Sequence, residues 1–342
     1  MSKAGVFMSN DQKNNTTQRS NNETTFVGID VAKDELVVHV LPTNQQLTVP
    51  NSKEGIKELV KLFKEIEPKQ VVLEATGGLE RALLTDLVAN GISAIAVNPR
   101  QARDLAKGLG ELAKTDAVDA RILARFAQLE CLTVRPVPSC ETQEMNDLVA
   151  RKEQLIHMRT MEKNRWDRTT QKAIQKSIKT IIATFEKEIA TIDARIEQMI
   201  ANNNDWNEKD KILQSVPGVG PKTSQVLISA LPELGTLNRQ EIAALVGVAP
   251  FADDSGKRKG TRHIKGGRAN VRSALYMAAF NAIKRNKTIK EWFDRLIEKG
   301  KKFKVALVAA MRKLIAILNV MVKTKTLWKE QNAPQDTVKK KK

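Results

Sequence analysis

Phe26-Val27-Gly28-Ile29-Asp30 is the stretch that decides the fold of the first part of the chain, because it is a short apolar run ending in a carboxylate. A second apolar run at 36–41, Leu-Val-Val-His-Val-Leu, follows after a turn. Two β-rich runs this close together predict an antiparallel hairpin, and residues 46–49 predict a third strand. The first domain is therefore expected to open with three consecutive strands.

Helices and strands alternate after this hairpin. Asn51-Ser52 opens an expected helix through about residue 66, whose apolar residues fall on one stripe. Further along come an expected strand at 71–74, a helix at 79–89, a strand at 94–97, and helical segments at 102–107 and 116–129. Three strands followed by alternating helices and strands predict an α/β domain with a mixed sheet.

The character of the sequence changes from residue 141 to about 201. Glycine is absent there, and apolar residues recur at roughly helical spacing with charges between them. This pattern predicts two long helices, either as an antiparallel hairpin or as an intermolecular coiled coil, ended by Asn202-Asn203-Asn204-Asp205. A third region, roughly 208–330, is expected to be helical with a Gly-rich and Lys/Arg-rich interior.

These shifts define the predicted domains. They are an α/β domain at 24–140, a helical hairpin at 141–206 and an all-α domain at 207–330. Residues 1–23 are rich in Asn, Gln, Ser and Thr and are expected to be disordered. The basic tail at 331–342 has no capacity to form a core.

Composition narrows the function. The chain has 342 residues with 57 Lys+Arg against 39 Asp+Glu, a formal net charge of +18, which points to a polyanionic partner. Two cysteines outside any CxxC pattern and three histidines argue against a disulfide scaffold and a Cys/His zinc site. Residues 1–23 lack the apolar run of a signal peptide, and the apolar stretch 305–322 contains Arg312 and Lys313, so it suits a buried helix better than a membrane span. A nucleic-acid-binding protein of the cytoplasm, with no membrane partner, is expected.

Four carboxylates lie at positions where they could act together as a metal site. Asp30 and Glu74 end two strands, and Asp116 and Asp119 lie three apart, on one face if their segment is helical. Such crowding is tolerable when cations neutralise it, and Mg²⁺ (or Mn²⁺) suits all-oxygen ligands. Taken singly, each residue has a simpler explanation, such as a helix cap at Asp116 or an ion pair of Asp119 with a nearby arginine. Taken together and in this order, they favour a metal site.

Two further motifs lie in the third region. Residues 215–224, with Gly218-Val219-Gly220-Pro221-Lys222-Thr223, read as a helix, a tight glycine turn and a new helix N-terminus, the helix-hairpin-helix signature of many DNA-binding proteins. Ser255 lies in a turn-like Asp-Asp-Ser-Gly run that precedes a basic stretch free of Asp and Glu up to residue 290. Its basic residues, which are expected to contact phosphates, are Lys257, Arg258, Lys259, Arg262, Lys265, Arg268 and Arg272.

The segments 26–34 (FVGIDVAKD), 73–78 (LEATGG) and 114–121 (KTDAVDAR) resemble the motifs of the DEDD-type insertion-sequence transposases. That family includes the Piv pilin-gene invertases and the bridge-RNA-guided recombinases. The resemblance implies a RuvC-like, ribonuclease-H-type fold for 24–140, with Asp30, Glu74, Asp116 and Asp119 as the metal-binding tetrad. It also implies a transposase domain in which Ser255 is the nucleophile, followed by Lys265-Gly266-Gly267-Arg268 and residues 271–277 (VRSALYM).

The resemblance implies a site-specific DNA recombinase of a mobile element. Ser255 would form a phosphoserine linkage with DNA, assisted by the carboxylate-bound metal, and the two sites could meet between protomers of a homodimer or homotetramer. A structured guide RNA is an expected partner beside double-stranded DNA, with a Piv-like invertase that uses no guide as the alternative. Two other interpretations stay open: a Holliday-junction-type nuclease that uses water, and a non-catalytic nucleic-acid-binding protein.

Overall fold

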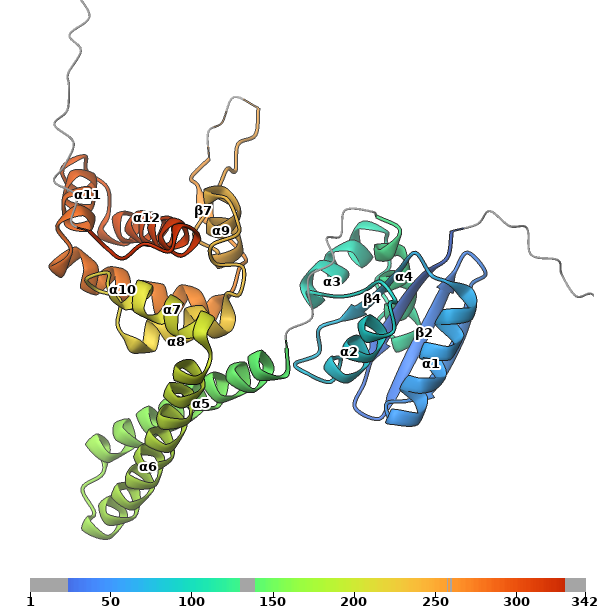
Figure 1. Cartoon of the computed structure of the whole chain (residues 1–342), viewed down its shortest axis with the longest axis horizontal. Helices are drawn as coiled ribbons and strands as arrows, with labels where there is room; N and C mark the ends of the chain where they lie inside the picture. The colour runs from blue at the N-terminus through green and yellow to red at the C-terminus, as the bar shows by residue number, and fades with distance from the viewer. Residues whose placement is uncertain (1–23, 130–138, 257, 259, 330–342) are drawn as a thin grey trace, which may run out of the picture. The chain divides into compact units, whose positions relative to one another are not determined.

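The computed structural model describes residues 24–129, 139–256, 258 and 260–329. The chain divides into two compact units at residues 137 and 138, and each is described by itself (Figure 1). The predicted tails at 1–23 and 331–342 lie outside the described residues.

The first unit is built on a five-stranded mixed sheet. Its strands are β1 (Phe26–Val31), β2 (Glu35–Leu41), β3 (Gln45–Pro50), β4 (Gln70–Glu74) and β5 (Ala94–Val97). They lie in the order β3-β2-β1-β4-β5, with β1, β2 and β3 antiparallel and β1, β4 and β5 parallel. The expected three-strand start and mixed sheet are confirmed.

Helices cover both faces of this sheet. They are α1 (Lys53–Ile66), α2 (Arg81–Ala89), α3 (Pro99–Gly108) and α4 (Asp116–Ala127). Apolar side chains of α1 and α2 share one buried cluster with the sheet, and those of α3 and α4 share another. The predicted start of α1 is confirmed, since the Ser52 hydroxyl accepts from the backbone N–H of Gly55 at 3.3 Å.

Gly28 is the point where α4 rests on the sheet. A Cβ atom placed on Gly28 would lie 2.1 Å from both the carbonyl oxygen of Ala120 and the backbone nitrogen of Ala124. The helix backbone thus contacts the strand backbone directly, which only glycine permits. This contact fixes the first turn of α4 relative to the end of β1.

The second unit begins with a pair of long helices, α5 (Cys140–Arg168) and α6 (Lys172–Asn202), which pack along each other (Figure 1). The predicted pair of helices is thus present within one chain, joined by a short turn. Near its base the buried ammonium of Lys152 pairs with Asp193 on α6 and donates to Gln225 Oε1 at 2.8 Å. Because Gln225 lies on the helix α8 (Pro221–Ala230), these bonds tie the pair to the rest of the unit.

The remaining elements form a helical bundle. They are α7 (Asn204–Gln214), α8, α9 (Arg239–Val246), two short strands β6 (Pro250–Phe251) and β7 (His263–Ile264), α10 (Ala269–Arg285), α11 (Lys287–Glu298) and α12 (Phe303–Thr324). By length and composition α12 could cross a membrane, yet 56% of its most apolar window is buried in the bundle. Leu307, Leu314 and Leu318 are fully buried there, as expected for a core helix.

Replacing Gly28 with Ala should destabilise the first unit by about 3 kcal/mol, because the new methyl group has to push backbone atoms of α4 aside. All four tryptophans, Trp166, Trp206, Trp292 and Trp328, lie in the second unit. Urea unfolding followed by circular dichroism should therefore shift to lower denaturant, while tryptophan fluorescence should not. Gly108→Ala is the matched control, since nothing lies within 4 Å of its Cβ position. Equal effects of the two substitutions would contradict the role given to Gly28.

Candidate active site

The backbone brings the four carboxylates to one edge of the first unit. Asp30 and Glu74 each stand one residue beyond the Ile29–Leu73 pair, so they end adjacent parallel strands. Asp116 and Asp119 lie in the first turn of α4, which Thr115 caps by accepting from the N–H of Val118 at 3.3 Å. Because α4 rests on β1 at Gly28, its first turn lies beside these strand ends.

The carboxylates act on one another electrostatically. Burial raises the pKa of Asp30 to about 6, and the negative charges of Asp116, Asp119 and Glu74 add to that rise. Burial and the charge of Asp119 also raise the pKa of Glu74, while Lys114 opposes that shift. Asp116, Asp119 and Glu74 thus lie close enough to Asp30 for their charges to act on it, and a metal site made by all four stays a prediction.

The donor set fits a hard divalent cation in chemistry. Carboxylate oxygens are the ligands that Mg²⁺ prefers, and a cation would relieve the repulsion that raises the pKa of Asp30. In the described ranges, no three His, Cys, Asp or Glu side chains are close enough together to hold a metal ion. Ligation therefore requires the carboxylates to draw closer together.

A loop after β4 fixes Glu74 at the site. Oε2 of Glu80 accepts from the backbone N–H groups of Thr76 and Gly78, at 3.1 and 2.8 Å. Gly77 and Gly78 have φ angles of +78° and +119°, which residues with a side chain rarely adopt. The glycine pair in the Leu-Glu-Ala-Thr-Gly-Gly motif thus permits the turn that follows the carboxylate.

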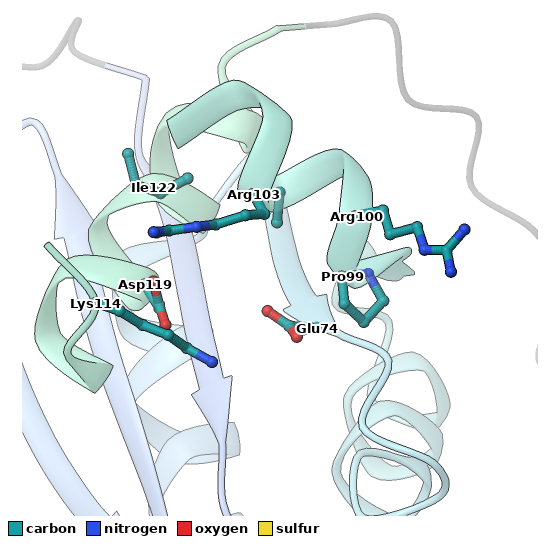
Figure 2. Close-up of a pocket in the computed structure, with 8 residues that line it drawn as sticks. Glu74, Pro99, Arg100, Arg103, Lys114, Asp119 and Ile122 are labelled. Carbon is teal, nitrogen blue, oxygen red and sulfur yellow. The ribbon is translucent and has the colours of Figure 1, made fainter. Parts of the chain in front are cut away.

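Cationic residues that sequence analysis missed flank the carboxylates. A cavity of about 270 Å³ is lined by Glu74 and Asp119 together with Arg100, Arg103 and Lys114. Figure 2 shows Arg103 and Lys114 extending beside Asp119, whereas Arg100 points away. Arg103 also donates to the carbonyl of Leu112 at 3.2 Å, which ties the segment before α4 to α3. The signal available in the sequence was the pair Arg100 and Arg103, which lie three residues apart in a helix that begins with Pro99.

Ser255 lies at the tip of a β-hairpin in the second unit, which projects beside α9 (Figure 1). Ser255 and Arg258 exchange both backbone hydrogen bonds, at 3.0 and 2.9 Å, and Gly256 in the turn has a φ of +54°. The Ser255 side chain is exposed. Gly260 is held against the other strand, since a Cβ there would lie 1.9 Å from the Asp253 carbonyl oxygen. The exposed serine is therefore tied through its backbone to Arg258.

The base of this hairpin uses two of the arginines that were expected to bind nucleic acid. Arg268 forms a bidentate ion pair with Glu233, with both N–O distances at 2.6 Å, and it donates to the Ala230 carbonyl. Arg272 donates to the Gly266 carbonyl at 2.7 Å. The structure thus corrects the expectation for Arg268, because Glu233 and the Ala230 carbonyl already occupy its guanidinium group. Arg272 makes one internal hydrogen bond, and its contact with nucleic acid stays a prediction. Both side chains hold the hairpin base in place.

The other basic residues of the hairpin fall into two groups. Arg258, Arg262 and Lys265 are exposed and have no side-chain partner among the described residues. Lys257 and Lys259 lie outside the described residues.

In the glycine turn between α7 and α8, and in the first turn of α8, some residues pack against the bundle and others face outward. Gly218 has a φ of +106°, and a Cβ there would lie 2.6 Å from Ala282, so it packs against α10. Thr223 is 8% exposed, so its side chain packs inward, and its role as a nucleic-acid contact stays a prediction. Gly220 has open space at its Cβ position and Lys222 is exposed, so these two stay available to a ligand.

Comparisons with known proteins place this geometry in a family. Residues 27–174 match a family model described as "Transposase", and residues 210–294 match one described as "Transposase IS116/IS110/IS902 family". The pilin gene-inverting protein of Moraxella bovis is 28% identical over 326 residues, which cover 91% of this chain and 98% of that protein. The insertion element IS110 uncharacterized 43.6 kDa protein of Streptomyces coelicolor is 28% identical over 123 residues, 35% of this chain and 30% of that protein.

Comparison with solved structures gives a distant likeness to a DNA-bound protein. T. thermophilus RuvC in complex with a Holliday junction substrate matches with 15% identity and a TM-score of 0.24, covering 30% of this chain and 90% of that one. That score is too low for the alignment to define a shared fold.

The chain belongs to the DEDD-type insertion-sequence transposases of the IS110 and IS116 group, which also contains the pilin gene-inverting proteins. It is accordingly a DNA transposase or invertase, an enzyme that recombines DNA.

The raised pKa of Asp30 makes the metal-free protein lose stability as pH rises. The folded state holds the Asp30 proton up to about pH 6, whereas the unfolded chain releases it near its ordinary value of 3.8. The free energy of unfolding should therefore fall between about pH 4 and pH 6, and Asp30→Asn should flatten that fall. Urea unfolding by circular dichroism in EDTA measures both. Asp34→Asn, at an exposed aspartate after the same strand, is the control. A wild-type profile that matches Asp30→Asn would contradict the assignment.

Proposed function

We propose that the enzyme cuts and joins DNA through a phosphoserine intermediate formed at Ser255. The observation that supports this most directly is the exposed serine, whose backbone pairs with that of Arg258 in a hairpin that also carries the exposed Arg262. Ser255 Oγ would bond to a DNA phosphorus as the bond to one DNA oxygen breaks. The serine loses its proton and the departing DNA hydroxyl gains one. Attack by another DNA hydroxyl then releases the serine, so the number of phosphoesters is conserved.

The converging carboxylates support a metal-assisted reaction. We propose that Asp30, Glu74, Asp116 and Asp119 hold Mg²⁺ or Mn²⁺, which would stabilise charge on the oxygens around the reacting phosphorus. Lys114 and Arg103 line the same cavity and would hold the phosphate against the carboxylate edge. The sheet order and the strand-end acids support a RuvC-like fold for this unit.

The carboxylates and the serine belong to different units of the chain. We propose that they meet in a complete active site within a homodimer or homotetramer, each site taking its serine and its carboxylates from different protomers. The open space at Gly220, the N-cap of α8, and the exposed Lys222 in the first turn of α8 support a helix-hairpin-helix contact with the DNA backbone.

A covalent-adduct assay tests the chemistry. Purified protein with its co-purifying RNA is mixed with Mg²⁺ and labelled DNA that carries the element's end junction, then run on a denaturing gel. Wild type should shift the label, whereas Ser255→Ala, Asp30→Ala and EDTA should each abolish the shift. Ser273→Ala, at an exposed serine on α10, is the matched control and should keep it. Cleavage that persists in Ser255→Ala without any adduct would assign the enzyme to water-dependent nucleases instead.

A structured guide RNA is the partner that we propose selects the DNA, supported by a net charge of +18. Ribonuclease treatment before DNA is added should then abolish the adduct, and RNA expressed from the element's flanks should restore it. The second candidate is guide-free inversion, favoured by the similarity to pilin gene-inverting proteins along nearly their whole length. An adduct that survives ribonuclease undiminished would select that candidate.

A further inference from the structure

Three cations from three helices meet on the bundle of the second unit, away from the serine hairpin in sequence. Helix α12 packs against both α9 and α11 (Figure 1). Through this packing Lys313 of α12 lies over the ring of Trp292 on α11, one turn before Arg295 on the same helix, and α9, which begins at Arg239, packs against α12 as well. The charges of both arginines act on the Lys313 ammonium. We call these three residues the α9–α11–α12 cluster.

The Lys313 side chain is fixed in this cluster. Its Nζ lies 4.5 Å from the centroid of the Trp292 ring, a cation–π contact that holds a half-buried side chain in one place. Burial lowers the pKa of Lys313, and the charges of Arg295 and Arg239 lower it further. The two arginines therefore repel the Lys313 ammonium across the helix contacts.

No counter-charge balances the cluster. Within the described part of the second unit, none of the three side chains forms an ion pair or a side-chain hydrogen bond. Glu241, two residues after Arg239, instead accepts from the backbone N–H of Asn238 at 2.8 Å as part of a capping box. Like charges gathered without a partner cost free energy, and an anion bound among them would offset that cost.

We propose that the α9–α11–α12 cluster binds phosphates of a nucleic-acid backbone, as a second contact surface apart from the serine hairpin. Arginine forks bind phosphate through two hydrogen bonds and lysine adds a point charge. This inference rests on the proposed action on DNA, and it extends that function by adding a nucleic-acid contact made by the helical bundle. DNA and RNA carry the same backbone phosphates, so the experiment distinguishes which of the two polymers supplies them.

The test compares two double variants of the full-length protein. Arg295→Gln with Lys313→Met removes two charges of the cluster while keeping the length of the lysine stem. Lys290→Gln with Lys304→Met removes two exposed charges from the same helices. Helical geometry places Lys304 about 180° around α12 from Lys313, and Lys290 about 140° around α11 from Arg295. The two variants thus differ in the face that loses charge, not in net charge.

Affinity is measured by fluorescence anisotropy with labelled duplex DNA and, separately, a labelled RNA hairpin at several KCl concentrations. For the ligand that the cluster holds, the cluster variant should bind about tenfold more weakly, and its slope of log affinity against log salt should fall by about 2. The control variant should stay near wild type. A loss confined to DNA or to RNA identifies the polymer, and a loss with both supports a shared backbone contact.

Unchanged affinity and slope with both ligands would overturn the proposal, as would an equal loss in the control variant. Circular dichroism melting checks that the cluster variant is folded. Should it unfold, Arg239→Gln at the exposed start of α9 replaces it, with a fall in slope of about 1. The serine chemistry fails or holds independently, because Ser255→Ala should abolish the covalent adduct while leaving these affinities unchanged.

Discussion

The direct contact between the α4 backbone and β1 at Gly28 is the constraint on which the carboxylate site depends. Two of the four carboxylates are carried by strands and two by a helix, so their separation is set by how closely that helix approaches the sheet. Any side chain at residue 28 would meet backbone atoms of Ala120, Leu123 and Ala124. Close approach buries Asp30 and crowds the negative charges around it, and burial first and then the neighbouring charges raise the pKa of Asp30.

Glycine contacts serve the second unit in the same way. Gly247 and Gly267 approach so closely that a Cβ on Gly267 would lie 2.2 Å from the Gly247 nitrogen. The Arg268–Glu233 ion pair then joins the start of α10 to the end of α8. These contacts hold together the two ends of the segment between α9 and α10, which carries the exposed Ser255.

The sequence predicted the elements well where local pattern decides them. The strands were predicted from short apolar runs, and the start of α1 was predicted from its N-cap residue Ser52. Both signals involve only residues close together in the sequence. The four carboxylates were found from their order along the chain. The ion pair between Arg268 and Glu233 was not predicted, because the two residues are 35 positions apart and only folding brings them together. The buried position of Thr223 likewise depends on neighbouring helices. The roles of the metal-site residues, of Ser255 and of the guide RNA stay predictions.

The buried Lys152 has a mechanical consequence. Its bonds to Asp193 and Gln225 lock the base of the α5–α6 pair onto α8, while the far end of the pair extends beyond the bundle (Figure 1). A long helical pair clamped at one end behaves as a stiff lever. A load on its distal turn would therefore reach the bundle through Lys152 and α8.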